Sequence, residues 1–284
     1  MAGHGLNIRI GAFDVALKST LPQVIRGVAK LYADFPLSPI GQFIDFRIEL
    51  SSPSLVRRWT RPQVNFDFDG KRPFKPLPLN QAFAMFEWGL NWVIANHAHE
   101  FAIVHAATVE KNGRGFIFPG APGSGKSTLC AALVCRGWRL LSDEMAMISL
   151  HDGLIWPIPR PVSLKNASIE IIRNFGSGMV LGDVVADTVK GDVAHMRPPR
   201  ASVEAANVPT RPFAVVFPTY RAGAQTDYAA LSKARTLMRL AENCFNYPVL
   251  GVAGFNCLAD TVEQSRCYTL SYSDLDDAIA TLER

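Results

Sequence analysis

The chain has 284 residues, of which 48% are hydrophobic and 19% charged, so it can bury a sizeable core as one large domain or as a small domain beside a catalytic one. Its formal net charge of +4 is too small to indicate nucleic acid or an acidic membrane surface as a partner. Five cysteines without a C-x-x-C pair argue against a disulfide framework or a zinc site, and no apolar run is long enough to span a bilayer, so we expect a cytoplasmic protein.

Residues 1–78 predict a small β-rich module. Short apolar runs alternate with turn residues there, and residues 43–50 alternate apolar and polar side chains as a half-buried strand does. The segment 69–78 is rich in proline, which cannot continue a ladder or a helix. We therefore divide the chain into this module and a catalytic domain of residues 79–284.

Helices and strands follow each other in the catalytic domain. Asn80 is a candidate cap for a helix that runs to about His97, because apolar residues recur at helical spacing over that stretch. An Asn-Gly pair at 112–113 predicts a hairpin between two strands. The expected strands are 101–109, 115–118, 138–141 and 213–217, and the expected later helices are 127–136, 228–241 and 273–282.

A glycine-rich loop between the strand 115–118 and the next helix carries the strongest motif. Gly120, Gly125, Lys126 and Ser127 meet the pattern G-x-x-x-x-G-K-S, in the strand–loop–helix context that phosphate binding requires. Such glycines turn successive N–H groups toward one concavity, and the lysine reaches the outer phosphates. We expect a nucleoside triphosphate, and ATP because no N-K-x-D loop follows. The predicted nucleotide-binding residues are Gly120, Ala121, Pro122, Gly123, Ser124, Gly125, Lys126, Ser127 and Thr128.

Two adjacent acids, Asp143 and Glu144, follow Ser127 after one predicted helix and one short strand. This spacing brings them to the end of the neighbouring strand. One carboxylate can then hold Mg²⁺ with the Ser127 hydroxyl, while the other takes a proton from an attacking hydroxyl. Because large ATPase motors often carry their acidic strand farther along, the spacing favours a compact kinase. The alternative is that the pair only caps a surface turn.

Three features occur in order between residues 104 and 148: His105 in Val-His-Ala-Ala, the loop Gly-Ala-Pro-Gly-Ser-Gly-Lys-Ser-Thr, and Arg-Gly-Trp-Arg-Leu-Leu-Ser-Asp-Glu ending at Glu144. Together they resemble the HPr kinase/phosphorylase family, and most closely its proteobacterial HprK-related kinase A group. The resemblance implies a P-loop fold shared with phosphoenolpyruvate carboxykinase, with a mixed sheet, and phosphorylation of a hydroxyl. It makes Asp143 the leading base and a magnesium ligand, supported by Glu144, with His105 and Lys126 near the transferred phosphate.

The resemblance extends more weakly over most of residues 79–284, through the segments 159–166 and 190–197. In HPr kinases the acceptor is a serine of a small carrier protein, and members of the related group tend to occur beside small peptide-binding proteins resembling the PqqD chaperone. The similarity therefore implies a peptide or protein acceptor. The chain has Glu144 where the family has Asp and lacks a Glu-Arg-Gly-Leu-Gly-Ile signature, so HPr itself and the phosphorylase reaction are not carried over.

Two basic clusters flanked by Gly and Pro are further candidates, since they can close over a phosphate and stabilise charge in the transition state. The alternative is that they lie in solvated loops. Their members are Arg160, Lys165, Lys190, His195, Arg197 and Arg200.

The sequence as a whole predicts an α/β P-loop kinase of the HPr kinase type, which uses ATP and Mg²⁺ to phosphorylate a serine of a peptide or protein. Two alternatives stay open. The acceptor can be a small hydroxylated metabolite, or the chain can be a nucleotide-dependent binding or assembly protein without phosphoryl transfer. We expect the aromatic residues of the segment 245–255 to pack in the core. The alternatives are that they shape a pocket or a homo-oligomer contact.

Overall fold

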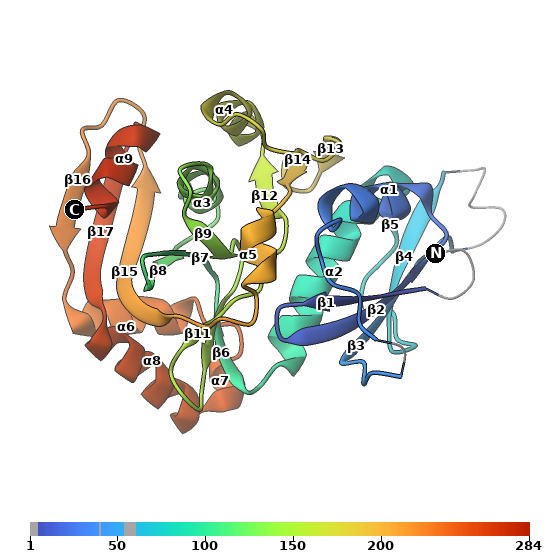
Figure 1. Ribbon diagram of the computed structural model, residues 1–284, viewed down its shortest axis with the longest axis horizontal. Coiled ribbons are helices and arrows are strands. Elements are labelled where there is room, and N and C mark those ends of the chain that lie inside the picture. The colour runs from blue at the N-terminus through green and yellow to red at the C-terminus, as the bar shows by residue number, and fades with distance from the viewer. Residues whose placement is uncertain (1–4, 40, 54–60) are drawn as a thin grey trace.

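Two groups of elements lie side by side in the computed structural model, which describes residues 5–39, 41–53 and 61–284 (Figure 1). The N-terminal strands form one group and the elements around the glycine-rich loop form the other. Helices combine with parallel and antiparallel strands, which confirms the predicted α/β class and the mixed sheet. Over the described ranges, no helix combines the length and the apolar character that crossing a membrane requires.

The N-terminal group is a five-stranded sheet in the order β1-β2-β3-β4-β5, with two helices packed against it. Strands β2 and β3 are parallel, and helix α1 makes the crossover between them. Strand β3 alternates buried and more exposed residues, as predicted for this region. The elements are β1 (Leu6–Ile10), β2 (Phe13–Ser19), α1 (Pro22–Leu31), β3 (Phe46–Ser51), β4 (Gln63–Phe68), β5 (Leu77–Pro78), η2 (Leu79–Gln81) and α2 (Ala82–His97).

Helix α2 joins the two groups. Its buried Phe86 and Leu90 share a core with the N-terminal sheet, and the same core continues to Ile103 of the P-loop half. The helix approaches β4 so closely that a Cβ on Gly89 would lie 2.0 Å from the Phe66 ring. The division of the chain after residue 78 stays a prediction, and α2, on the far side of that division, packs on the N-terminal sheet.

A six-stranded sheet in the order β16-β17-β15-β8-β7-β9 carries the glycine-rich loop. Strand β15 is parallel to β8 and β17, and the other pairs are antiparallel. Helices α3 and α9 cover one face, and α6 and α8 cover the other (Figure 1). The elements are β7 (Ala106–Lys111), β8 (Arg114–Pro119), α3 (Lys126–Cys135), β9 (Arg139–Ser142), β15 (Arg211–Tyr220), β16 (Asp227–Ala230), α6 (Lys233–Glu242), α8 (Val252–Gln264), β17 (Arg266–Tyr272) and α9 (Leu275–Leu282).

Two three-stranded sheets, β11-β10-β6 and β12-β14-β13, complete the P-loop half. Their strands are β6 (Phe101–Val104), β10 (Ala146–Ser149), β11 (Ile155–Trp156), β12 (Val162–Lys165), β13 (Val185–Thr188) and β14 (Gly191–Met196). Three short helices lie among them and the later strands: α4 (Ala167–Phe175), α5 (Arg200–Glu204) and α7 (Tyr247–Leu250).

Two sequence predictions for this half are wrong in detail. The expected single strand 101–109 breaks at His105 into β6, which pairs with β10, and β7, which pairs with β8 and β9. The expected helix 228–241 begins instead as strand β16, because this segment pairs with β17. The predicted hairpin between β7 and β8 is confirmed, with Asn112 and Gly113 both at positive φ as an Asn-Gly turn requires.

Candidate active site

The glycine-rich loop connects β8 to the first turn of α3, as predicted. Gly123 and Gly125 have φ of 85° and 95°, which favours glycine at both positions. At Gly125 a side chain is also excluded by space, since a Cβ would lie 2.5 Å from the Tyr272 hydroxyl. That hydroxyl donates a hydrogen bond to the Gly125 carbonyl at 3.1 Å. Strand β17 thus holds the end of the loop against the start of the helix.

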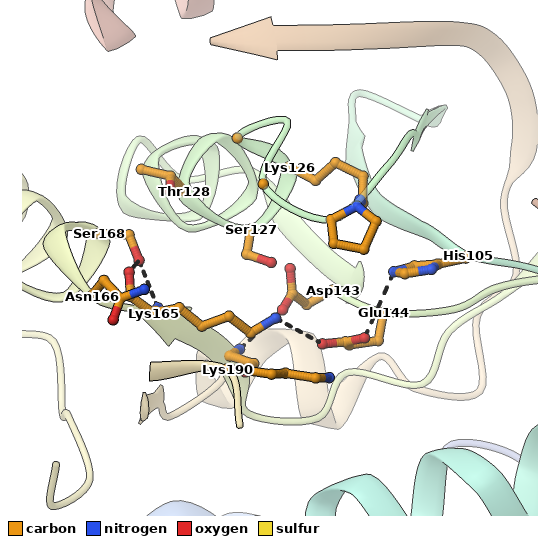
Figure 2. Close-up of a pocket in the computed structure, with 14 residues that line it drawn as sticks. His105, Lys126, Ser127, Thr128, Asp143, Glu144, Lys165, Asn166, Ser168 and Lys190 are labelled. Atoms are coloured by element: carbon orange, nitrogen blue, oxygen red, sulfur yellow. Dashed lines mark hydrogen bonds and ion pairs between the residues drawn. The ribbon is translucent and has the colours of Figure 1, made fainter. Parts of the chain in front are cut away.

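The backbone N–H groups of the first helical turn are free of helical partners, so the loop and α3 together offer an anion site. Pro122, Gly123 and the stretch 125–128 line a pocket of about 440 Å³ in front of this turn (Figure 2). Gly120, Ala121 and Ser124, also predicted to bind the nucleotide, do not line this pocket. The Ser124 carbonyl accepts the Tyr220 N–H at 3.0 Å, which ties the loop to β15.

Lys126 folds over the loop that precedes it. Its ammonium donates to the carbonyls of Gly120 at 2.5 Å and Ala121 at 3.0 Å. Burial lowers the pKa of this lysine, while the neighbouring carboxylates of Asp143 and Glu144 oppose the shift. Lys126 also lines the pocket in front of the anion site, where its ammonium can exchange loop carbonyls for phosphate oxygens.

Asp143 lies directly after β9 and faces the Ser127 side chain (Figure 2). Its Oδ2 accepts the Ser163 N–H at 2.9 Å, while Oδ1 is buried and has no hydrogen-bond partner among the described residues. Burial raises the pKa of this carboxyl to about 7, helped by the nearby Glu144 and opposed by the Ser163 amide and the Ser127 hydroxyl. One buried oxygen of Asp143 is therefore left for a ligand.

Glu144 points away from Asp143 toward three basic groups (Figure 2). Its carboxylate lies 3.9 Å from His105 Nε2 and 3.9 Å from Lys165 Nζ. Burial alone would raise the pKa of Glu144, but the attraction of Lys165 and then of Lys190 outweighs it, so the pKa is lowered. Glu144 is thus an ionised carboxylate on the wall of the pocket.

The break between β6 and β7 places His105 in the pocket. The backbone N–H of His105 donates to the Asn243 carbonyl at 2.7 Å, and its ring stacks on Phe245 with centroids 5.3 Å apart. Burial lowers the pKa of His105, Lys126 adds to this, and Glu144 opposes it. A neutral imidazole beside Glu144 follows at neutral pH.

Two of the predicted basic residues, Lys165 and Lys190, line the same pocket. Lys165 ends β12, and Lys190 lies in the turn between β13 and β14. Burial lowers the pKa of Lys190, with Glu144 opposing. The structure therefore gathers Lys126, Lys165 and Lys190 around the two acids.

The other predicted basic residues lie elsewhere, and the expectation that they close over a phosphate is corrected. Arg160 is buried against α2, where it donates to Asn91 at 2.6 Å and lies 3.5 Å from Glu87. Arg197 pairs with Asp34, which follows α1. Both guanidinium groups pair with residues of the N-terminal elements, which holds them away from the phosphate site.

His195 and Arg200 also lie outside the P-loop pocket. His195 is buried in β14 with its ring edge against Phe83, and burial lowers its pKa to about 4. Arg200 is an exposed residue of α5 that pairs with Glu204. Neither residue faces the phosphate site.

Sequence reasoning missed several residues that build the pocket. Ser163 supplies the amide on Asp143, and Asn166 and Ser168 line the wall beside Lys165. Asn166, directly before α4, has a positive φ of 52°, which is uncommon for residues other than Gly and is enriched for Asn, so an Asn just before a helix was the available signal. Tyr272 comes from a distant strand, and no local pattern marks it.

Magnesium fits the Asp143 side of this pocket. No cluster of three or more His, Cys, Asp or Glu able to hold a metal occurs in the described ranges. However, the buried free oxygen of Asp143 and the facing Ser127 hydroxyl are the hard oxygen donors that Mg²⁺ prefers, and phosphate oxygens usually complete such a site.

The fold and the site together define a mixed α/β protein with a glycine-rich anion site beside a pair of acids. No protein-family model matches this chain, and a comparison with curated proteins likewise finds no match.

Proposed function

We propose that this chain is an ATP-dependent kinase that transfers the γ-phosphoryl group to the hydroxyl of a serine in a peptide or protein. The observation that carries the proposal is that one pocket holds the glycine-rich loop, Lys126 and both acids, with Asp143 and Glu144 facing different partners. Phosphoryl transfer depends mainly on positioning and on charge stabilisation, and these are the groups it requires. The resemblance to HPr kinases supports the same reaction and the same mixed-sheet fold type.

The phosphates of ATP bind the N–H groups of the loop and of the first turn of α3, and Lys126 stabilises their outer charges. Lys165 and Lys190 stabilise the charge that develops as the phosphoryl group moves. Ser127 and Asp143 would hold Mg²⁺, which neutralises phosphate charge when it is bound. Together, the loop and these lysines place the γ-phosphate next to Glu144.

The two acids have different parts in the proposed reaction. The Ser163 N–H already occupies one oxygen of Asp143, and Asp143 faces the Ser127 hydroxyl, the other proposed metal ligand. We therefore assign Asp143 to the metal and Glu144 to the proton, which departs from the role of leading base that the family resemblance implies for Asp143. Phosphates that bind Lys165 and Lys190 weaken their hold on Glu144 and make it more basic.

The proposed reaction transfers the phosphoryl group directly from ATP to the acceptor hydroxyl. The acceptor hydroxyl gives its proton to Glu144 as its oxygen bonds to the γ-phosphorus. The bond from the γ-phosphorus to the bridging oxygen breaks, and ADP leaves with that oxygen. His105 Nε2 lies 3.9 Å from Glu144, and because the imidazole is neutral at physiological pH it adds no fixed positive charge beside the carboxylate.

A labelling experiment tests the proposal. Purified protein is incubated with ATP carrying a radioactive γ-phosphate and with fractionated cell lysate, beside the variants Lys126→Ala and Asp143→Asn. We expect labelled serine in an acceptor fraction with the wild type only, and nucleotide binding that survives in Asp143→Asn. A protein that binds ATP but labels no acceptor in any fraction would be a binding or assembly protein instead.

A further inference from the structure

An apolar cavity of about 590 Å³ lies beside the P-loop pocket, and the proposed phosphate chemistry does not use it. Phe74, Leu77, Trp88 and Trp92 are among the residues that line it. Val189, in the turn that also carries Lys190, lies at its edge and is 97% exposed. A hollow of this size with aromatic and aliphatic walls is typical of a binding site.

The apolar cavity adjoins the candidate active site. Lys190 lines both pockets, and its ammonium lies 5.4 Å from the centre of the Trp88 ring. A third cavity, of about 300 Å³, shares Trp92 with the apolar cavity and Glu144 with the P-loop pocket, and Phe245 lines its far side. Glu144, the proposed proton acceptor, lines the P-loop pocket and the third cavity, and the third cavity shares Trp92 with the apolar one. We call the two cavities that border α2 the α2 groove.

The length of the α2 groove distinguishes a peptide from a small metabolite. The residues of α2 that line it extend from Met85 to Asn96, and this stretch of helix rises by ~16 Å at 1.5 Å per residue. An extended peptide covers that distance with about five residues. A small hydroxylated metabolite would occupy only part of it.

We propose that the α2 groove binds the acceptor as an extended peptide, with a large apolar side chain in the cavity at Trp88 and the serine hydroxyl at Glu144. This inference rests on the proposed kinase function and adds the recognition element of the substrate. Trp88 of the apolar cavity and Ala95 of the cavity beside Glu144 are separated by ~10 Å along the helix. The apolar residue therefore lies about two or three positions from the serine.

Charge selects the same kind of peptide. Lys75 and Lys190 are the charged residues among the described residues that line the apolar cavity, and no carboxylate lines it with them. A peptide with an acidic residue next to its apolar one complements this rim, whereas a basic peptide is repelled.

Peptides with a fluorescent label and one serine test the inference. In one series Phe is placed at each position within about four residues of the serine in turn, and the reference peptide has Ala instead. Binding is followed by fluorescence anisotropy, and phosphoryl transfer is measured on the same peptides. We expect Phe two or three positions from the serine to tighten binding by ~10-fold or more and to lower KM more than it changes kcat.

Exposed residues supply variants that keep the fold. Val189→Asp places a charge at the apolar cavity and is expected to abolish the preference for Phe. Val252→Asp, at a valine of α8 that is 76% exposed and lines none of the three hollows, is expected to keep it. Lys75→Glu is expected to weaken binding of acidic peptides, and Lys71→Glu, with the same change of charge outside the groove, is not.

The outcomes separate the two proposals. Equal binding of the Phe and Ala peptides, or equal effects of Val189→Asp and Val252→Asp, would overturn the groove. Transfer to serine without any preference for Phe would leave the kinase standing and remove the groove. Preference in binding without transfer to any peptide would leave the groove standing and overturn the kinase.

Discussion

The P-loop pocket and the α2 groove share Glu144 and Lys190 but are built in opposite ways. A single short segment, 120–128, gives the pocket its loop N–H groups and Lys126. Side chains from α2, from the proline-rich segment before it and from the β13–β14 turn form the groove. In this account the chemistry common to many ATP-binding proteins is local in sequence, whereas selection of the acceptor depends on how the two halves of the fold meet.

The largest effect is expected from Lys126→Ala, which separates the two regions. Loss of this ammonium should reduce phosphoryl transfer by about a thousand-fold, because it removes the main positive charge at the outer phosphates. Peptide binding in the α2 groove should be unchanged. Initial rates and anisotropy measure the two properties, with Lys71→Ala as an exposed lysine control. A parallel loss of peptide binding would show that the regions are not separate.

The acid pair is expected to give the next largest effect. Glu144→Gln and Asp143→Asn should each lower kcat by about a hundred-fold or more. Only Asp143→Asn should raise the Mg²⁺ concentration needed for half-maximal rate, since its free oxygen faces Ser127. A magnesium titration of the rate distinguishes the two roles. The same metal dependence in both variants would contradict the assignment.

His195, which is buried in the hairpin that carries Lys190, is expected to make the stability of the protein depend on pH. Burial, with Arg160 adding to it, lowers the pKa of folded His195 to about 4, against about 6.5 in the unfolded chain. The unfolded chain therefore takes up a proton first as pH falls, and stability is lost between about pH 6.5 and 4. The loss from this residue is about 2 to 3 kcal/mol.

Urea unfolding of the wild type and of His195→Met at pH 7 and pH 4.5 measures this contribution. The free energy of unfolding should fall less steeply with acid in the variant. Identical slopes would mean that His195 is not held neutral by its surroundings.

The smallest effect is expected at Arg197, which joins the end of β14 to the N-terminal group through Asp34. Because this ion pair is only partly buried, Arg197→Ala should lower stability by about 1 kcal/mol. Phosphoryl transfer should be unchanged, in contrast to Lys165→Ala, which removes a pocket lysine. A thermal melt and a rate assay of both variants check this. A large loss of transfer in Arg197→Ala would restore the role that its sequence position suggested.

The sequence predicted the parts of the fold that depend on near neighbours. The motif with Gly125 and Lys126 specifies a loop, and flanking apolar runs specify its strand and helix. The break at His105 could not be predicted, because residues on both sides are buried in different sheets and read as one apolar strand. Helix α1 was missed although Val24, Val28 and Leu31 have helical spacing, since the turn-rich surroundings suggested strands alone.

The candidate site was predictable to the same extent. Asp143 and Glu144 follow the loop at a short, readable spacing. The sequence did not indicate that Lys165 and Lys190 line the pocket while Arg160 does not, because the residues that pair with Arg160 lie on α2, far away in the chain. Which basic residues stay free for a phosphate is decided by tertiary contacts.

The most direct test of the account is mass spectrometry of cell lysate treated with ATP and either the wild type or Lys126→Ala. We predict phosphoserine peptides that occur only with the wild type and that carry a large apolar residue about two or three positions from the serine. The same set of phosphopeptides in both samples would contradict the central claim that this chain is a kinase.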